Sequence, residues 1–192
     1  LSGAATVEGR LTGTSAELRV AGTLDGGSIG YGDYRALDLD ATFDALIPDL
    51  DYTRATGSTK VSSTMIEGLP IGAQNADLTA SYDGSAVTFK GTLRGQGRDI
   101  EAPGRAGLHA DHQEVHLSAL SVAAGDQRWA LEGGDAAIQY GRDALVLKGV
   151  TLVSGASRIS VDGTLPFDAN RAVGPLRVQV VNVDLAALEP LL

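Results

Sequence analysis

The sequence predicts an all-β fold: a long, curved, mostly antiparallel sheet with an apolar concave face. Apolar and polar residues alternate over many short stretches, a pattern typical of strands with one wet face. The 192 residues include 25 glycines and 6 prolines but only 5% aromatic residues. A five-residue pattern (apolar, any, Gly, any, Leu) recurs at 7–11, 20–24, 89–93 and 161–165. Its glycine suits a strand that bends or approaches a neighbour closely.

The clearest strand–turn–strand unit spans 143–168, where two alternating runs flank a short turn. Residues 49–66 alternate weakly, and we expect them to form a strand pair near an edge of the sheet. Alternation predicts further strands, in chain order, at 4–11, 15–25, 37–43, 77–82, 86–93, 115–119, 128–131, 137–140 and 175–183.

Glycine and aspartate clusters between these runs predict the turns. In chain order, the expected turns lie at 12–14, 25–27, 83–84, 109–113, 125–126, 133–135 and 141–143, with breaks in the chain pattern at 68–72 and 102–104. The end of the chain differs, because Leu185, Leu188 and Leu192 fall on one helical face behind a potential N-cap, Asp184. Pro190 limits this helix, so we expect a short C-terminal helical turn.

Composition excludes several classes of function. The absence of cysteine excludes disulfides, thiolate metal sites and a cysteine nucleophile. A net charge of −9 argues against binding to nucleic acid or to an anionic membrane surface. No signal peptide or transmembrane run is recognisable, and the chain opens within a strand pattern at Leu1. We therefore expect 1–192 to be a single segment of a longer protein.

Two short motifs resemble catalytic or calcium sites without the context that such sites need. Residues 26–30 match the G-x-S-x-G nucleophile elbow around Ser28, but no buried strand precedes them and no helix follows. The carboxylates and hydroxyl of 38–44 mimic the first ligands of a calcium loop, yet Phe43 and Asp49 stand where Gly and Glu are required. Solvated strand and loop residues explain both motifs more simply.

Three histidines, His109, His112 and His116, lie close together with Asp111 and Glu114 between them. Imidazoles and carboxylates can form a zinc site. His109 and His116 have opposite parity on a strand, however, so a polar surface hairpin is the simpler interpretation. We expect no metal, no cofactor and no enzymatic activity.

The apolar strand positions form the remaining constellation. They can fill a closed core or line an open groove for lipid, and alternation alone does not distinguish the two. The shortage of core-filling aromatic residues favours the groove. The predicted lining is Leu37, Leu39, Phe43, Leu78, Tyr82, Val87, Phe89, Leu93, Val115, Leu117, Leu145, Leu147, Ile159, Val161, Leu176, Val178 and Val180.

The short strands that end in Gly-x-Leu, the stretch at 150–168 and the following LRVQVVNVDLAALEPLL resemble the repeat region of TamB-type proteins. These are the inner-membrane-anchored subunits of the translocation and assembly module, related to AsmA-like proteins. The resemblance covers most of the chain and is strongest after Asp143. It implies a "β-taco", a U-shaped sheet with an apolar interior, in the periplasm of a Gram-negative envelope.

The same resemblance implies phospholipid transport towards the outer membrane, with an Omp85-class outer-membrane protein as partner. We therefore expect a passive lipid conduit. A scaffold that assists outer-membrane protein or autotransporter assembly by β-augmentation is a second hypothesis. A structural β-solenoid is a third. Free sheet edges also make edge-to-edge self-association conceivable.

Overall fold

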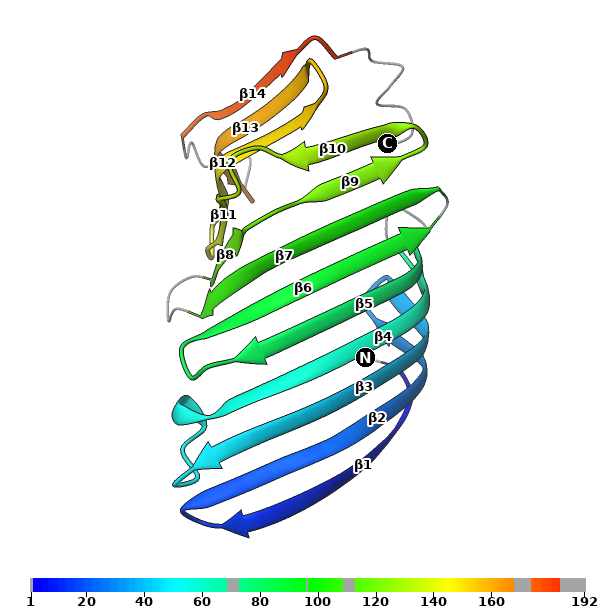
Figure 1. The fold of residues 1–192 in the computed structure, drawn as a ribbon, viewed down its shortest axis with the longest axis vertical. Helices are drawn as coiled ribbons and strands as arrows, with labels where there is room; N and C mark the ends of the chain where they lie inside the picture. Colours follow the sequence, from blue (N-terminus) through cyan, green and yellow to red (C-terminus); the bar gives the residue numbers. More distant parts are fainter. Residues whose placement is uncertain (1, 69–72, 96, 109–112, 168–173, 184–192) are drawn as a thin grey trace. The chain divides into compact units, whose positions relative to one another are not determined.

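The computed structural model describes residues 2–68, 73–95, 97–108, 113–167 and 174–183. Among these residues are fourteen strands, assigned to an antiparallel sheet, and one three-residue 3-10 helix (Figure 1). The predicted all-β, antiparallel fold class is therefore confirmed. The chain divides into two compact units, residues 1–98 and 99–192.

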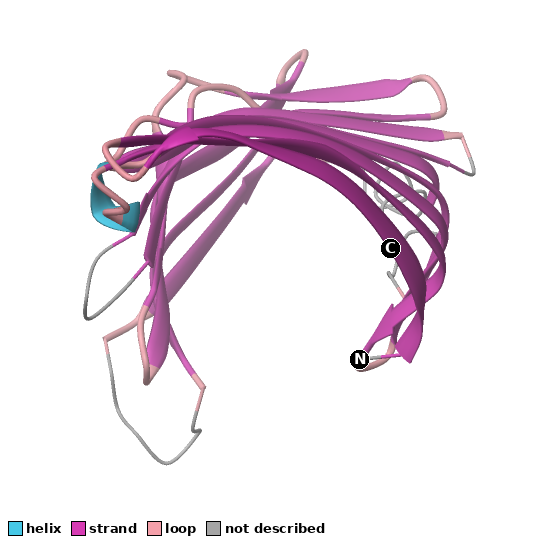
Figure 2. Cartoon of the chain, turned by 90° about the horizontal axis from the view of Figure 1, so that it is seen from below, coloured by secondary structure: helices cyan, strands magenta, loops and turns pink. Residues whose placement is uncertain are grey.

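The first unit is an antiparallel meander in which each strand pairs with the next one along the chain. In Figure 2 the ribbons of this unit bend along their length. Its elements are β1 (Ser2–Thr14), β2 (Glu17–Tyr31), β3 (Tyr34–Pro48), the 3-10 helix η1 (Tyr52–Arg54), β4 (Thr56–Glu67), β5 (Ala73–Tyr82) and β6 (Ala86–Gly95).

Two of the expected turns in this unit are wrong. Residues 12–14 lie within β1, and the chain turns instead at 15–16. Residues 25–27 lie in the middle of β2, where Asp25 faces Thr6 on one side and Asp40 on the other. Gly26 is buried there and Gly27 is exposed, and both continue a long strand instead of reversing the chain. The expected turn at 83–84 is confirmed between β5 and β6.

The segment 49–66 also differs from the expected strand pair. It forms η1 followed by the single strand β4, which lies between β3 and β5 in the interior of the sheet. Asp51 caps η1, since its carboxylate accepts hydrogen bonds from the Thr53 backbone N–H at 2.9 Å and from the Thr53 hydroxyl at 2.6 Å. These hydrogen bonds hold the pKa of Asp51 below its ordinary value.

The second unit contains more and shorter strands. The strand β7 runs through Ala102-Pro103-Gly104 without the expected interruption. Its elements are β7 (Arg98–Leu108), β8 (Gln113–Leu117), β9 (Ser121–Ala124), β10 (Gln127–Leu131), β11 (Ala136–Tyr140), β12 (Ala144–Ser154), β13 (Ser157–Pro166) and β14 (Leu176–Val181).

The strands β8 and β9 act as two parts of one interrupted long strand, and so do β10 and β11. The strand β7 pairs with both β8 and β9, and β12 pairs with both β11 and β10. Consequently 133–135 does not reverse the chain into a hairpin: β11 pairs with β8 and β12, and β10 pairs with β9. Trp129, on β10, is 1% exposed and is the largest fully buried side chain among the described residues.

The strand–turn–strand unit predicted at 143–168 forms the hairpin of β12 and β13, with its turn at 155–156. Expected turns at 125–126 and 141–143 are also confirmed. The C-terminal helical turn at 184–192, most of the turn at 109–113 and most of the break at 68–72 lie outside the described residues. Within the described ranges, no helix has the length and apolarity required to traverse a bilayer.

Candidate functional site

The register of the first unit aligns apolar side chains of successive strands into rows. One row runs through Val7, Leu24, Ala41, Val61 and Leu78. Because paired residues of antiparallel strands point to the same face, these side chains share one side of the sheet. We call this side the apolar face. A second row comprises Gly9, Gly22, Phe43, Thr59, Ala80 and Phe89, and a third comprises Leu11, Val20, Ala45, Gly57, Tyr82 and Val87.

The predicted lining residues of this unit fall on the apolar face with one exception. Leu39 and Leu93 belong to a further row that also contains Gly26, Ser63 and Ala76. Leu37 shares the parity of Leu39, and the unshifted register sets it opposite Ser28 and Met65, both of which have positive φ. Neither ladder forms a regular pair at Leu37, so Leu37 is not counted in a row. The lining residues placed by the rows are Leu39, Phe43, Leu78, Tyr82, Val87, Phe89 and Leu93.

Sequence reasoning did not include β1 and β2 in the lining. Val7, Leu11, Val20 and Leu24 extend the same rows across these two strands. The alternation that identified β3 and β5 is present in β1 and β2 as well. Both strands were predicted from this alternation, at 4–11 and 15–25, but their apolar residues were left out of the predicted lining.

The opposite side of the first unit is polar. One row contains Glu8, Thr23, Thr42, Lys60, Thr79 and Lys90. Arg19 donates hydrogen bonds to both carboxylate oxygens of Asp44, the shortest at 2.6 Å, and this pairing raises the pKa of Arg19 above its ordinary value. The hydroxyl of Thr64 donates to Asp38 at 2.8 Å. These exposed pairs contribute little to stability, and they keep this side solvated.

The apolar face is incompletely covered. Val7 and Leu11 are 60% and 68% exposed, and Leu78 in the interior strand β5 is 38% exposed. Phe43, Tyr82, Val87 and Phe89 are half-buried. A face packed against a second layer would hold most of these side chains near full burial. The fully buried hydrophobic residues of this unit, among those described, are instead the small Ala73 and Ala86.

A shallow apolar hollow of ≈ 260 Å³ lies on this face over β3 to β6. Its walls include Phe43, Ala45, Ala80, Tyr82 and Val87, and its surface is almost entirely apolar. The hollow carries no convergent polar groups of the kind that orient a small polar substrate. Its chemistry suits a flexible hydrocarbon.

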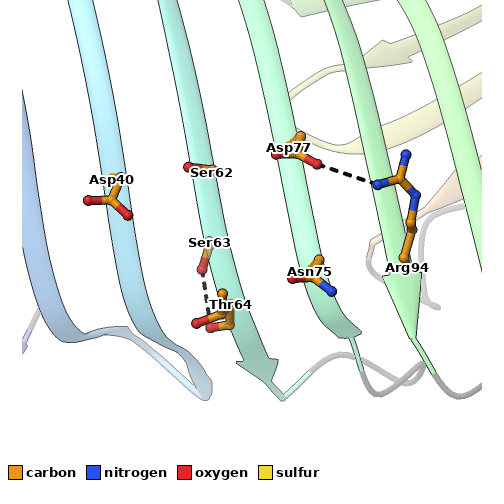
Figure 3. Close-up of a pocket in the computed structure, with 7 residues that line it drawn as sticks. All are labelled: Asp40, Ser62, Ser63, Thr64, Asn75, Asp77 and Arg94. Carbon is orange, nitrogen blue, oxygen red and sulfur yellow. Dashed lines mark hydrogen bonds and ion pairs between the residues drawn. The ribbon is translucent and has the colours of Figure 1, made fainter.

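A second hollow, of ≈ 330 Å³, lies towards one end of β3 to β6 and is polar (Figure 3). Asp77 lies 3.9 Å from Arg94 in an exposed ion pair, and Ser63 donates a weak hydrogen bond of 3.5 Å to the carbonyl oxygen of Thr64. Its other lining residues are Asp40, Ser62 and Asn75. Within the described ranges, no group of three or more His, Cys, Asp or Glu residues is arranged to hold a metal ion.

The second unit has its own apolar rows. Val115, Ile138, Leu147, Gly163 and Leu176 are paired in succession from β8 to β14. Val161 pairs with Val150 and Val178, and Ile159 pairs with Leu152 and Val180. The predicted lining residues that these rows and their continuations contain are Val115, Leu117, Leu145, Leu147, Ile159, Val161, Leu176, Val178 and Val180.

The motifs considered for catalysis and metal binding do not form such sites among the described residues. Ser28 lies within β2, and β3 follows it where a nucleophile elbow requires a helix. The acidic residues at 38–44 alternate along the polar side of β3, as the simpler interpretation expects. His116 lies with Nε2 3.2 Å from Glu114 and Nδ1 3.3 Å from Asp135. His109 and His112 lie outside the described residues.

Comparison with known proteins identifies no relative. No family model, no curated protein and no solved structure matches the chain.

Proposed function

We propose that this chain is a segment of a hydrophobic conduit that moves phospholipid between the inner and outer membranes of a Gram-negative envelope. In this proposal the sheet is a U-shaped β-taco with its apolar face inward. The segment belongs to a TamB- or AsmA-like protein that is anchored in the inner membrane and extends through the periplasm. An Omp85-class outer-membrane protein is the proposed partner.

The observation that carries the proposal is the continuity of the apolar rows. In the first unit they cross every strand from β1 to β6. The side chains in them are half-buried or exposed, so the face retains apolar area that an acyl chain can cover. Burial of one methylene contributes about 0.8 kcal/mol, and an acyl chain spread along several rows therefore binds without any specific polar contact.

Transport along such a face requires no catalysis. A row of Leu, Val, Phe and Ala side chains offers equivalent contacts at successive strands, which lie about 4.8 Å apart. An acyl chain can therefore exchange one set of contacts for the next at little cost in free energy. The polar side of the sheet, with its carboxylates and hydroxyls, keeps the protein soluble in the periplasm.

Replacement of Leu78 by glutamate tests the proposal, with Thr79→Glu as the matched control. The two residues are neighbours on β5 and point to opposite sides of the sheet. Both are exposed, so neither variant should unfold the protein. The measurement is native mass spectrometry with lipid extraction on protein expressed in a Gram-negative host. We expect phospholipid to co-purify with the wild type and Thr79→Glu, and at least about fivefold less with Leu78→Glu.

Lipid-free wild-type protein, or equal loading of the two variants, would contradict the conduit. The second hypothesis is a scaffold for strands of outer-membrane proteins. A scaffold of this kind binds through backbone groups of the edge. It therefore predicts that peptide strands from outer-membrane proteins bind the wild type and both variants with the same affinity.

A further inference from the structure

The apolar hollow over β3 to β6 has a floor of small residues, which sets it apart from the rest of the apolar face. Ala45 on β3 pairs with Gly57 on β4, and Thr59 on β4 pairs with Ala80 on β5. All four residues line the hollow. The hydroxyl of Thr59 donates a hydrogen bond of 2.9 Å to the backbone carbonyl oxygen of Thr42. The side chains of the floor therefore require no polar partner and offer contacts that suit a hydrocarbon.

Larger side chains form the two walls of the hollow. The ring of Phe43 lies against Gly22 of β2, since an added Cβ on that glycine would be 2.7 Å from Cζ of Phe43. The ring thus extends towards β2, away from β4, and leaves the space over Gly57 open. Tyr82 and Val87, which pair across β5 and β6, form the opposite wall. The hollow is a trough of ≈ 260 Å³ between these walls.

One end of the trough reaches the strand ends that carry η1. Ala55, which directly follows η1, lines the trough. The turn at 83–85 lies beside it, because an added Cβ on Gly84 would be 3.6 Å from the Ala55 carbonyl oxygen. We call the segments 49–54 and 83–85 the acidic rim. Its charged residues are Asp49, Asp51, Arg54 and Asp83.

We propose that the trough seats one acyl chain of phosphatidylethanolamine, with the ammonium group of the lipid at the acidic rim. This inference rests on the proposed conduit and adds to it a fixed binding position and a choice of lipid. Three carboxylates against one guanidinium favour a head group that carries a cation and disfavour one that carries only a phosphate. Tyr82, the last residue of β5, directly precedes the rim. Its amphipathic side chain suits the boundary between acyl chain and head group.

Filling the trough tests the seat. Protein freed of lipid is incubated with vesicles that contain equal amounts of phosphatidylethanolamine and phosphatidylglycerol with identical acyl chains, and native mass spectrometry counts the bound lipids. Ala80→Phe should bind at least about fivefold less lipid than the wild type, because the ring occupies the seat although it adds apolar area. Ala76→Phe is the matched control. It makes the same change on the same face of β5 but outside the trough, and it should keep wild-type loading.

A second variant fills the trough from the neighbouring strand. Ala45→Leu, on β3, should reduce lipid loading as Ala80→Phe does. Both alanines are half-buried beside open space, so the larger side chains have room. Urea unfolding followed by circular dichroism checks that each variant is folded, and if one is not, the other carries the test.

Neutralising the rim tests the choice of lipid. The wild type should prefer phosphatidylethanolamine to phosphatidylglycerol by at least about threefold, and Asp49→Asn with Asp83→Asn should bring the two lipids close to equality. Asparagine tolerates the positive φ of Asp49 and keeps a side-chain oxygen for the Ser85 N–H, which Asp83 accepts at 2.9 Å. The control, Asp25→Asn with Asp40→Asn, changes the net charge equally on the polar side of the sheet and should keep the preference.

The outcomes separate this inference from the conduit itself. Wild-type protein that binds no lipid would overturn both. Lipid that is lost from Leu78→Glu but retained by Ala80→Phe and Ala45→Leu would leave the conduit standing and overturn the seat. Equal loading of the two lipids by the wild type, a preference for phosphatidylglycerol, or a preference that both double variants reduce equally would overturn the placement of the head group at the acidic rim.

Discussion

Gly22 illustrates how a single position shapes the apolar face. An added Cβ there would lie 2.3 Å from the Glu8 carbonyl oxygen and 2.7 Å from Cζ of Phe43. Gly22 also pairs directly with Phe43 across β2 and β3. The Phe43 ring therefore lies over the glycine, and a large side chain occupies the volume that a small one leaves free. Two other glycines of the recurrent Gly-x-Leu pattern also pair with large residues, Gly91 with Leu78 and Gly163 with Leu147.

Gly22→Ala should lower the free energy of unfolding by about 1–3 kcal/mol, because the added methyl group forces Phe43 and the β1 backbone aside. The control is Gly27→Ala on the same strand, where an added Cβ meets nothing within 4 Å. It should leave stability unchanged or raise it slightly, because alanine restricts the unfolded chain. Urea denaturation measures both variants. Equal losses of stability would contradict the close approach of Phe43 to Gly22.

At the scale of one element, β12 shows how a strand keeps its apolar side chains on one face despite an irregular sequence. Leu145 and Leu147 share one parity, whereas Val150 and Leu152 share the other. The register with β13 shifts by one residue between Leu147 and Val150, and Gly149 has φ +65°. This is a β-bulge, in which one extra residue restores the alternation. Without it, either the first or the second half of β12 would turn its apolar residues to the polar side.

Deletion of Lys148 should destabilise the second unit severely, by at least about 3 kcal/mol, because it removes the extra residue and inverts the face of half of β12. Lys148→Ala is the control: it keeps the bulge and changes only an exposed side chain, so the loss should stay within about 0.5 kcal/mol. Hydrogen exchange at β12 and β13 is the measurement. Slow exchange in the deletion variant would show that the bulge does not set the register.

The interrupted strands of the second unit likewise depend on pairing that the local sequence does not show. Ser118-Ala119-Leu120 separates β8 from β9, and Glu132 to Asp135 separates β10 from β11. Gly133 and Gly134 both have positive φ, which glycine adopts without strain. In the sequence these glycines have the same signature as a hairpin turn. Only the pairing partners, β8 and β12 for β11, reveal that the chain continues in its original direction.

At the scale of the whole molecule, the defining property is that many apolar side chains are exposed while few hydrophobic residues form a buried core. The buried hydrophobic residues among those described are few, and most are alanines. At the same time, Val178 and Val180 on β14 are 59% and 49% exposed, and Val7 and Leu11 on β1 are more exposed still. A net charge of −9 offsets this surface by favouring solubility. The protein is expected to be soluble and yet adherent to hydrocarbon.

The folded protein should therefore bind the neutral dye Nile red, with a fluorescence increase that disappears cooperatively as urea unfolds the chain. A neutral dye avoids repulsion by the acidic protein. Added detergent monomers or fatty acid should compete for the same surface. If the native protein leaves the dye in water, and binding occurs only in partly unfolded states, the apolar rows are covered and the conduit loses its physical basis.

The sequence by itself determined the two-sided character of the strands. Alternation depends only on neighbours along the chain, so β3, β5, β6 and the β12–β13 hairpin were predictable, and with them the apolar lining residues of these strands. Tertiary structure decided which glycines turn the chain and which continue a strand, as at 25–27. It also decided which glycine lies beneath a side chain of the next strand, as Gly22 does beneath Phe43. It also decided the bulge in β12 and the interrupted strands. These features depend on register between strands, and register is set by packing between residues distant in sequence, which a local pattern does not contain.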